Sequence, residues 1–443
     1  MTEADFRDWE RQISTAGACS RPIRLRGTIT AVDLATGEVA PVYDTSSESG
    51  GVLHVACGNR RESACPACSA TYKRDARQLV RSGLAGGKGI PDTIAEHPCV
   101  FATFTAPSFG PVHARRERAG TLLPCRPRRD KNKRACPHGR DISCPLRHVP
   151  DDPRLGHPMC PDCYDYPQAV WFNTRAGRLW SRFTTYLSRH LARCAGVTQK
   201  ALAAEIKVRY VKVAEYQARG VVHFHAIIRI DANTDSPLGD GPLLPPPPMW
   251  TGDLLAAAIV TAAAAVTVPA RPGDPASPLL RFGPQTDTRI VTSGTGQALS
   301  RSAVANYIAK YSTKTLDVPG LPAYPIASLA DVRTLRCHAH YKRMIETAWT
   351  LGQHKWAHAL GYGGHFLTKS RRYSVTFGQL RTARRDYRRA QRHPNGETDP
   401  WGRPLDERVV LVLNDFTYAG SGYSASDARM LALISADSAR KHR

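Results

Sequence analysis

The chain has 443 residues, of which 42% are hydrophobic. This excludes a disordered protein and allows two or three domains. The formal net charge of +23 favours a polyanionic partner, most commonly nucleic acid, over charge that serves solubility alone. The first ten residues are too polar for a secretory signal, and the most apolar run, residues 254–268, is too short to span a bilayer. We therefore expect a cytoplasmic protein without a membrane partner.

Helical and strand patterns both occur along the chain. The predicted elements are a helix over 69–82, a strand over 101–107, an amphipathic helix over 175–193, a β-hairpin over 205–230, an Ala-rich helix over 254–268, a strand over 281–291, a helix over 300–313, a β-like run over 406–416 and a terminal helix over 425–440.

Composition suggests four segments. They are an N-terminal segment (1–53), a Cys-rich helical segment (54–97), a central domain (98–316) with a Cys-rich insertion (113–165) and a Pro/Ala-rich insertion (232–278), and a helical, basic C-terminal region (317–443).

Twelve cysteines occur, and several have the spacing of metal ligands. Cys-x-x-Cys pairs in a cytoplasmic chain favour one or two closed structural zinc sites over unmetallated thiols. The predicted zinc ligands are Cys57, Cys65, Cys68, Cys136, Cys144, Cys160 and Cys163. Their grouping stays open, and the residues that could substitute for them are His54, Cys125, His138 and His148. The solitary cysteines are interpreted as small hydrophobic residues, namely Cys19, Cys194 and Cys337.

The hairpin contains the first candidate for a catalytic metal. In its second strand, apolar residues alternate with His223 and His225, so both imidazoles should lie on the face opposite the core. The turn would bring Glu215 back toward them as an oxygen ligand. Two histidines and one carboxylate leave coordination positions open, which suits a catalytic metal. The alternative is a hairpin whose polar face merely contains two histidines.

Two tyrosines on the helix over 300–313 are candidate nucleophiles. Tyr307 and Tyr311 are four residues apart and would share a helix face with Lys310 beside them. By themselves they would more often be core residues. A nearby cation and a base would make a phenol usable as a nucleophile toward a phosphodiester.

Together, these motifs resemble the HUH endonucleases (His-hydrophobe-His), specifically rolling-circle replication initiators of actinomycete (Streptomyces-type) integrative and conjugative plasmids. His223-Phe224-His225 is similar to the metal motif, Tyr307-Ile-Ala-Lys310-Tyr311 to the two-tyrosine motif, and residues 101–107 to the first motif, with Phe104 replacing the usual leucine. The segments Cys57-Gly-Asn-Arg-Arg and residues 364–373 look typical of the actinomycete group, so the resemblance extends from Cys57 to the C-terminus.

The resemblance implies an α+β fold: a central antiparallel sheet of the RRM/ferredoxin-like type, with helices on one side, the histidines on a middle strand and the tyrosines on a helix above it. It also implies a nicking-closing enzyme that uses Mg²⁺ or Mn²⁺ and forms a 5′-phosphotyrosine link with plasmid origin DNA, leaving a free 3′ hydroxyl. Double-stranded and single-stranded DNA, a host helicase and a polymerase would be partners. The residues expected to bind DNA are Arg219, Lys314, Lys369, Arg371, Arg372, Arg384 and Arg385.

Two rival interpretations stay open. One is a zinc-containing DNA-binding protein without nuclease activity, in which the histidines only support the fold. The other is a different HUH enzyme, such as a relaxase or a transposase. The sequence also does not rank the two tyrosines, although Tyr307 is slightly favoured as the first nucleophile.

Overall fold

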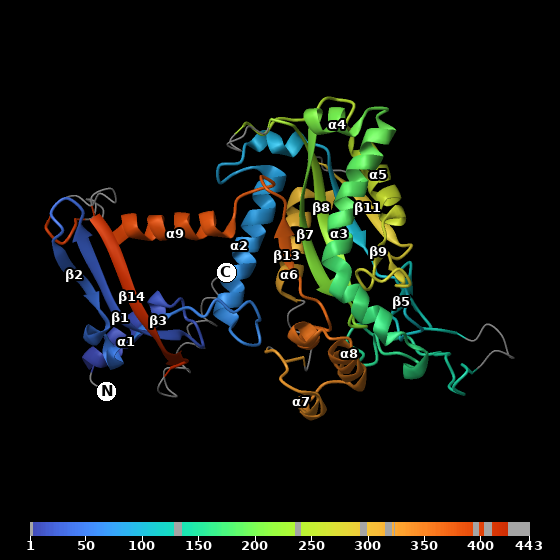
Figure 1. The fold of residues 1–443 in the computed structure, drawn as a ribbon, viewed down its shortest axis with the longest axis horizontal. Helices are drawn as coiled ribbons and strands as arrows, with labels where there is room; N and C mark the ends of the chain where they lie inside the picture. Colours follow the sequence, from blue (N-terminus) through green and yellow to red (C-terminus); the bar gives the residue numbers. More distant parts are fainter. Residues whose placement is uncertain are drawn as a thin grey trace. The chain divides into compact units, whose positions relative to one another are not determined.

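The computed structural model describes residues 3–127, 135–234, 241–292, 299–314, 321–322, 324–392, 398–402 and 410–423. The chain forms two compact units (Figure 1). The larger comprises residues 79–375, and the smaller combines residues 1–78 with residues 376–443. Both units contain antiparallel sheets and helices, as the mixed α+β prediction requires.

A six-stranded sheet organises the larger unit, in the order β12-β11-β4-β8-β7-β13. The strands are β4 (Cys99–Phe104), β7 (Ile206–Tyr216), β8 (Val222–Ala232), β11 (Thr286–Thr292), β12 (Leu299–Ser300) and β13 (Leu367–Lys369). All neighbours are antiparallel except β11 and β12. The β7–β8 hairpin therefore lies inside the sheet, with β8 between β7 and β4.

Two helices cover one face of this sheet (Figure 1): α3 (Tyr166–Cys194) and α5 (Gly252–Ala265). Asp165 accepts a hydrogen bond from the Gln168 amide and so caps the N-terminus of α3. The alternate residues of β8 predicted to face the core, among them Phe224 and Ile228, are buried against these helices. The rings of Trp180 and Phe183 pack against Phe104 of β4, with centroids 5.4 and 4.8 Å away. The period of two thus correctly predicted which side chains of the hairpin form the core.

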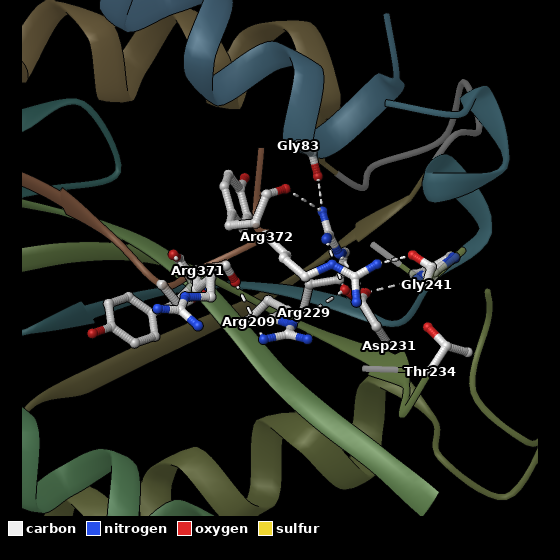
Figure 2. A network of polar contacts seen from close by, with 12 residues as sticks. Gly83, Arg209, Arg229, Asp231, Thr234, Gly241, Arg371 and Arg372 are labelled. Atoms are coloured by element: carbon white, nitrogen blue, oxygen red, sulfur yellow. Dashed lines mark hydrogen bonds and ion pairs between the residues drawn. The ribbon is translucent and has the colours of Figure 1, made fainter. Parts of the chain in front are cut away.

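The opposite face of the sheet is covered by α6 (Arg301–Lys314) and by a buried polar network. In that network Arg229 forms two contacts of 2.6 and 2.9 Å with Asp231, which is also 2.8 Å from His97. Figure 2 shows Arg229 directed toward the carbonyl oxygen of Gly83 at the end of α2 (Pro66–Ala85). A fully buried guanidinium needs such partners, so this face is fixed by ion pairs and carbonyl acceptors. Helices therefore lie on both faces of the sheet: α3 and α5 on one, and α6, which carries the tyrosines, on the other.

Both ends of the described chain meet in the smaller unit. Its sheet consists of β1 (Ile23–Asp33), β2 (Val39–Asp44), β3 (Leu53–Val55) and β14 (Val410–Ser421). β14 pairs antiparallel with the whole of β1, from Ile23 opposite Ser421 to Asp33 opposite Val410. The helices of this unit are α1 (Glu3–Thr15), α9 (Phe377–Arg392) and the first part of α2.

The remaining elements are short. They are β5 (Arg116–Arg118), β6 (Thr121–Leu123), α4 (Gln199–Glu205), β9 (Val268–Pro269), β10 (Leu279–Leu280), α7 (Leu329–Thr334), α8 (Ala339–Thr350) and five 3₁₀ turns at Thr45–Ser47, Ser49–Gly51, Asp92–Glu96, Pro161–Cys163 and His354–Ala359. None of the helices in the described ranges is long and apolar enough to cross a membrane.

Most predicted elements are confirmed with shifted ends, whereas the four predicted segments do not coincide with the two units. The strand at 281–291 begins later, at Thr286. The helix at 175–193 begins earlier, at Tyr166. The C-terminal region is not uniformly helical, because β14 completes the sheet of the smaller unit. The predicted helix over 425–440 lies outside the described residues.

Candidate functional site

The hairpin places two histidines and a carboxylate together. Glu215 of β7 lies directly opposite His223 of β8 in the antiparallel register. The Glu215 Oε2 atom is 2.9 Å from His223 Nε2 and 3.1 Å from His225 Nε2. All three ligand atoms lie within 4.8 Å of one another, so this cluster could hold a metal ion. The third ligand comes close because cross-strand partners point to the same face of a sheet.

The neighbouring strand β4 supports this cluster. Thr103 lies opposite His225, and its Oγ1 is 3.1 Å from His225 Nδ1. The ring of Phe101 stacks on the His225 ring at 5.9 Å. A partner on Nδ1 fixes the ring so that Nε2 faces the cluster, as is usual for histidines that bind metals.

Local electrostatics favour the protonation states that a metal requires. Burial lowers the pKa of His225, which favours the neutral imidazole. Burial by itself would raise the pKa of Glu215, but hydrogen bonds with His223 and His225 outweigh it and the pKa falls below its usual value. A neutral histidine and an ionised glutamate are both competent ligands.

Tyr307 of α6 lies against this cluster. Its ring meets the ring of His225 edge-on at 5.2 Å and that of Phe101 at 5.6 Å. The Tyr307 side chain is 38% exposed, so it is not the core residue that its helical spacing would suggest. Lys310 is exposed on the same helix. The backbones of Tyr311 and Lys314 belong to α6, while their side chains lie outside the described part of the structure.

Four cysteines form a second cluster, in the smaller unit: Cys19, Cys57, Cys65 and Cys68. The sulfur atoms of Cys57 and Cys68 are 3.7 Å apart, as are those of Cys65 and Cys19. This spacing is far longer than a disulfide and close to the edge of about 3.8 Å expected for four sulfurs around one zinc ion. Hydrogen bonding with Cys19 lowers the pKa of Cys57 to about 7, which favours the thiolate that binds metal.

Two further clusters lie in the Cys-rich insertion of the larger unit. One contains His113, Cys125, Cys144 and His148, and the other contains Cys136, His138, Cys160 and Cys163. In the first cluster, Cys144 Sγ is 3.5 Å from His148 Nε2, and Asp152 contacts the other nitrogen of His148 at 2.6 Å. In the second, Cys163 Sγ is 3.2 Å from His138 Nδ1.

The ligands of these two clusters are interleaved along the chain. The pair 113/125 is followed by 136/138 of the other cluster, then by 144/148 of the first and 160/163 of the second. Each cluster thus closes a loop that carries ligands of its neighbour. Two ions bound in this way would cross-brace the insertion.

This grouping places Cys19 among candidate ligands and indicates which residues could share an ion. Cys19 is a fully buried member of the four-cysteine cluster, although it was interpreted as an ordinary hydrophobic residue. Three four-residue clusters are present among the described residues, where one or two sites were expected. His113 was also missed. Neither residue has a Cys-x-x-Cys partner that could have revealed it, because both are brought in by the fold.

The basic residues expected to bind DNA lie in different surroundings. The guanidinium of Arg219 donates to the carbonyl oxygens of Pro107 and Ala106 at 2.7 and 2.8 Å, so it fixes the hairpin turn. Arg372 donates to the Gly241 carbonyl (Figure 2). Arg384 pairs with Asp75.

Three other residues expected to bind DNA differ in their exposure to solvent. Lys369 is half-buried in β13, while Arg371 and Arg385 are exposed.

Comparison with known proteins identifies the family. The family model described as RepSA, replication initiator protein of pSAM2, matches residues 5–437. The chain belongs to this replication initiator family. A replication initiator protein from Streptomyces ambofaciens is 43% identical over 447 aligned positions, which cover 97% of this chain and 90% of the relative. No solved structure matches the chain significantly.

The region of the chain that matches the family extends beyond the motifs of the larger unit. The sequence resemblance began at Cys57, whereas the family match begins at residue 5 and so includes β1 and Cys19. Both units of this initiator, with all four clusters, therefore lie within the matched region.

Proposed function

We propose that this initiator nicks one DNA strand at a plasmid double-strand origin by the chemistry of an HUH endonuclease, and rejoins DNA at termination. The supporting observation is the His223/His225/Glu215 cluster with the ring of Tyr307 5.2 Å from that of His225. A nucleophile and a metal-binding set on adjacent elements are the two parts that such a reaction needs.

The donor set fits a divalent ion such as Mg²⁺ or Mn²⁺. Two imidazoles and one carboxylate provide three ligands and leave positions for a phosphate oxygen, unlike the four-residue clusters. When bound, the ion would polarise the scissile phosphate and orient it for displacement. His223, His225 and Glu215 would hold the ion, and Thr103 would keep His225 in the orientation that this requires.

Tyr307 would supply the nucleophile. Its phenolic oxygen attacks phosphorus as the phenol loses its proton, and a bond from phosphorus to the tyrosine oxygen forms. The bond between phosphorus and the 3′ oxygen breaks, and that oxygen takes up a proton to become the free 3′ hydroxyl that primes synthesis. Lys310, one helical turn from Tyr307, would offset negative charge on the phosphate. Tyr311 would serve the second transfer, which closes the displaced strand.

The remaining clusters would be structural zinc sites. Each has four cysteine or histidine ligand atoms within 4.8 Å, the number and kind that closed zinc sites use. Because every position is taken by protein, these sites would stabilise loops rather than bind a reacting phosphate.

A nicking assay on supercoiled plasmid carrying the cognate origin, with Mn²⁺ present, tests the proposal. We expect His225→Ala to reduce nicking to background, while His190→Ala, a histidine on α3 outside every cluster, nicks as wild type does. Tyr307→Phe should lose the covalent DNA adduct of the first cleavage. Tyr324→Phe, a 66% exposed tyrosine, should keep it.

The outcomes separate the candidate functions. Wild-type protein that binds the origin but leaves the plasmid supercoiled would be a zinc-containing DNA-binding protein without nuclease activity. Full activity in His225→Ala would refute the metal assignment. Adducts that persist when Tyr307 and Tyr311 are both phenylalanine would refute the tyrosine assignment.

A further inference from the structure

The smaller unit contains a cavity of about 460 Å³ that the nicking chemistry does not use. Its walls come from four segments: the chain near Thr15, the chain near Gly58, the first turns of α2, and one face of α9. Five arginines line it, with a single aspartate: Arg60, Arg74, Arg381, Arg384, Arg388 and Asp75. Such an excess of one charge in a concave site attracts anions.

The arginines of α9 form a row along the cavity. Phe377, Arg381, Arg384 and Arg388 follow one another at intervals of four, three and four residues, which places them on one face of the helix. From Arg381 to Arg388 the helix rises roughly 10 Å, which is about three nucleotide steps along one strand of B-DNA.

Only part of this charge is neutralised within the protein. Arg384 pairs with the buried Asp75, and Arg60 lies over the ring of Tyr72 at 4.7 Å. Among the described residues, no acidic side chain forms an ion pair with Arg381 or Arg388, and both arginines are exposed. A zinc-loaded Cys19 cluster, whose Cys68 touches the cavity, would add about two negative charges. A positive excess would still remain.

The aromatic residues at the cavity favour contact with phosphates over stacking on bases. Tyr72 and Phe377 stack on each other with centroids 5.2 Å apart, and Arg60 covers a ring face. Their faces are thus already used inside the protein. Arginines offered in a row, without a free aromatic platform, are typical of backbone contacts that carry no sequence information.

We propose that this cavity binds the sugar-phosphate backbone of duplex origin DNA, with Arg381 and Arg388 as phosphate ligands. The inference rests on the proposed function in taking origin DNA as the ligand. It adds a second DNA contact, on the unit that does not contain the hairpin.

The test compares Arg388→Ala and Arg381→Ala with Arg77→Ala in the full-length, metal-loaded chain. Arg77 is an exposed arginine of α2 in the same unit that does not line the cavity. Binding of a duplex origin fragment is measured from about 0.05 to 0.3 M salt. Each lost phosphate contact should reduce the slope of log K against log salt by about 0.9 and weaken binding about fivefold at 0.15 M salt. Arg77→Ala should leave both values unchanged.

Two additional measurements make the result specific. Cleavage of an unpaired oligonucleotide that contains the nick site should be unchanged in the cavity variants, because that reaction reports on the hairpin site. If wild type does not cleave but the slopes change as expected, the nicking proposal fails and the cavity proposal stands. Equal slopes for Arg388→Ala and Arg77→Ala would overturn the cavity proposal. So would loss of metal from the Cys19 cluster in the cavity variants, since the arginines would then serve the thiolates.

Discussion

The hairpin cluster and the interleaved pair of clusters in the insertion could each hold metal ions, but different kinds of structure position their ligand atoms. Glu215, His223 and His225 belong to two neighbouring strands inside a sheet, and hydrogen bonds of the ladder set their positions. The eight ligands of the insertion lie mostly in loops, with only short pairings such as β5–β6 beside them. A site built on a sheet can leave coordination positions open because the sheet holds the ligands. A site built on loops needs its bound ions to keep those loops ordered.

The largest expected difference concerns the interleaved pair. Cys160→Ser removes one ligand of one cluster, but the loop that this cluster closes carries Cys144 and His148 of the other. We therefore expect bound zinc to fall from three ions per chain to one, and Tm to fall by about 10 °C or more. Zinc analysis and thermal unfolding measure this, with the exposed Cys194→Ser as the control. Loss of a single ion would show that the two clusters are independent.

The four-cysteine cluster should behave as an isolated site. Cys19→Ser should remove one zinc ion and leave the two of the insertion in place, because the cluster shares no ligand with them. Cys337→Ser, which alters a cysteine outside every cluster, should retain all three ions. If the Cys19 variant also retains all three, Cys19 is the small buried hydrophobic residue that its sequence context suggested.

Within the hairpin site, the orienting contact should affect metal affinity more than turnover. Thr103→Val keeps the shape of the side chain but removes the Oγ1 partner of His225 Nδ1. We expect the Mn²⁺ concentration for half-maximal nicking to rise about 10- to 100-fold, with the rate at saturating Mn²⁺ near that of wild type. Thr288→Val, on the adjacent strand β11, is the matched control. A reduced rate at saturation with unchanged affinity would contradict an orienting role.

The smallest effect is expected on the core face of the hairpin. Lys212 of β7 is buried, with Nζ 4.2 Å from the centre of the Phe224 ring, and burial lowers its pKa to about 7. Below pH 7 the ammonium is charged in the folded and unfolded states, and the folded state bears the full cost of burial. Between pH 7 and about 10.4 the unfolded chain binds more protons, so wild-type stability rises with pH in this window.

Lys212→Met should therefore stabilise the protein most at pH 6, and progressively less between pH 7 and about 10.4. Chemical denaturation at pH 6 and pH 9 measures this difference. Nicking by the variant should match wild type, since Lys212 faces away from the histidines. A stability difference that does not change with pH would contradict the buried, uncharged lysine.

The hairpin was predictable because its information is local. A period of two placed Phe224 in the core and His225 opposite it, and an eight-residue separation placed Glu215 across the turn from His223. Strand geometry converts such spacings directly into positions in space. Cys65 and Cys68 were predicted to lie together for the same reason, and both belong to the four-cysteine cluster.

Contacts between distant segments were not predictable in this way. Cys19 reaches Cys57 across 38 residues, and β14 pairs with β1 across most of the chain. The seven-residue recurrence of Arg381 and Arg388 predicts a shared helix face, but only the fold brings α2 beside it to form a cavity. By itself the sequence determined the ligand types, their strand and helix spacing, and the charge, because these depend on neighbours along the chain. The tertiary structure decided which cysteines and histidines cluster together and which arginines face a common cavity, because those arrangements follow from how distant segments pack.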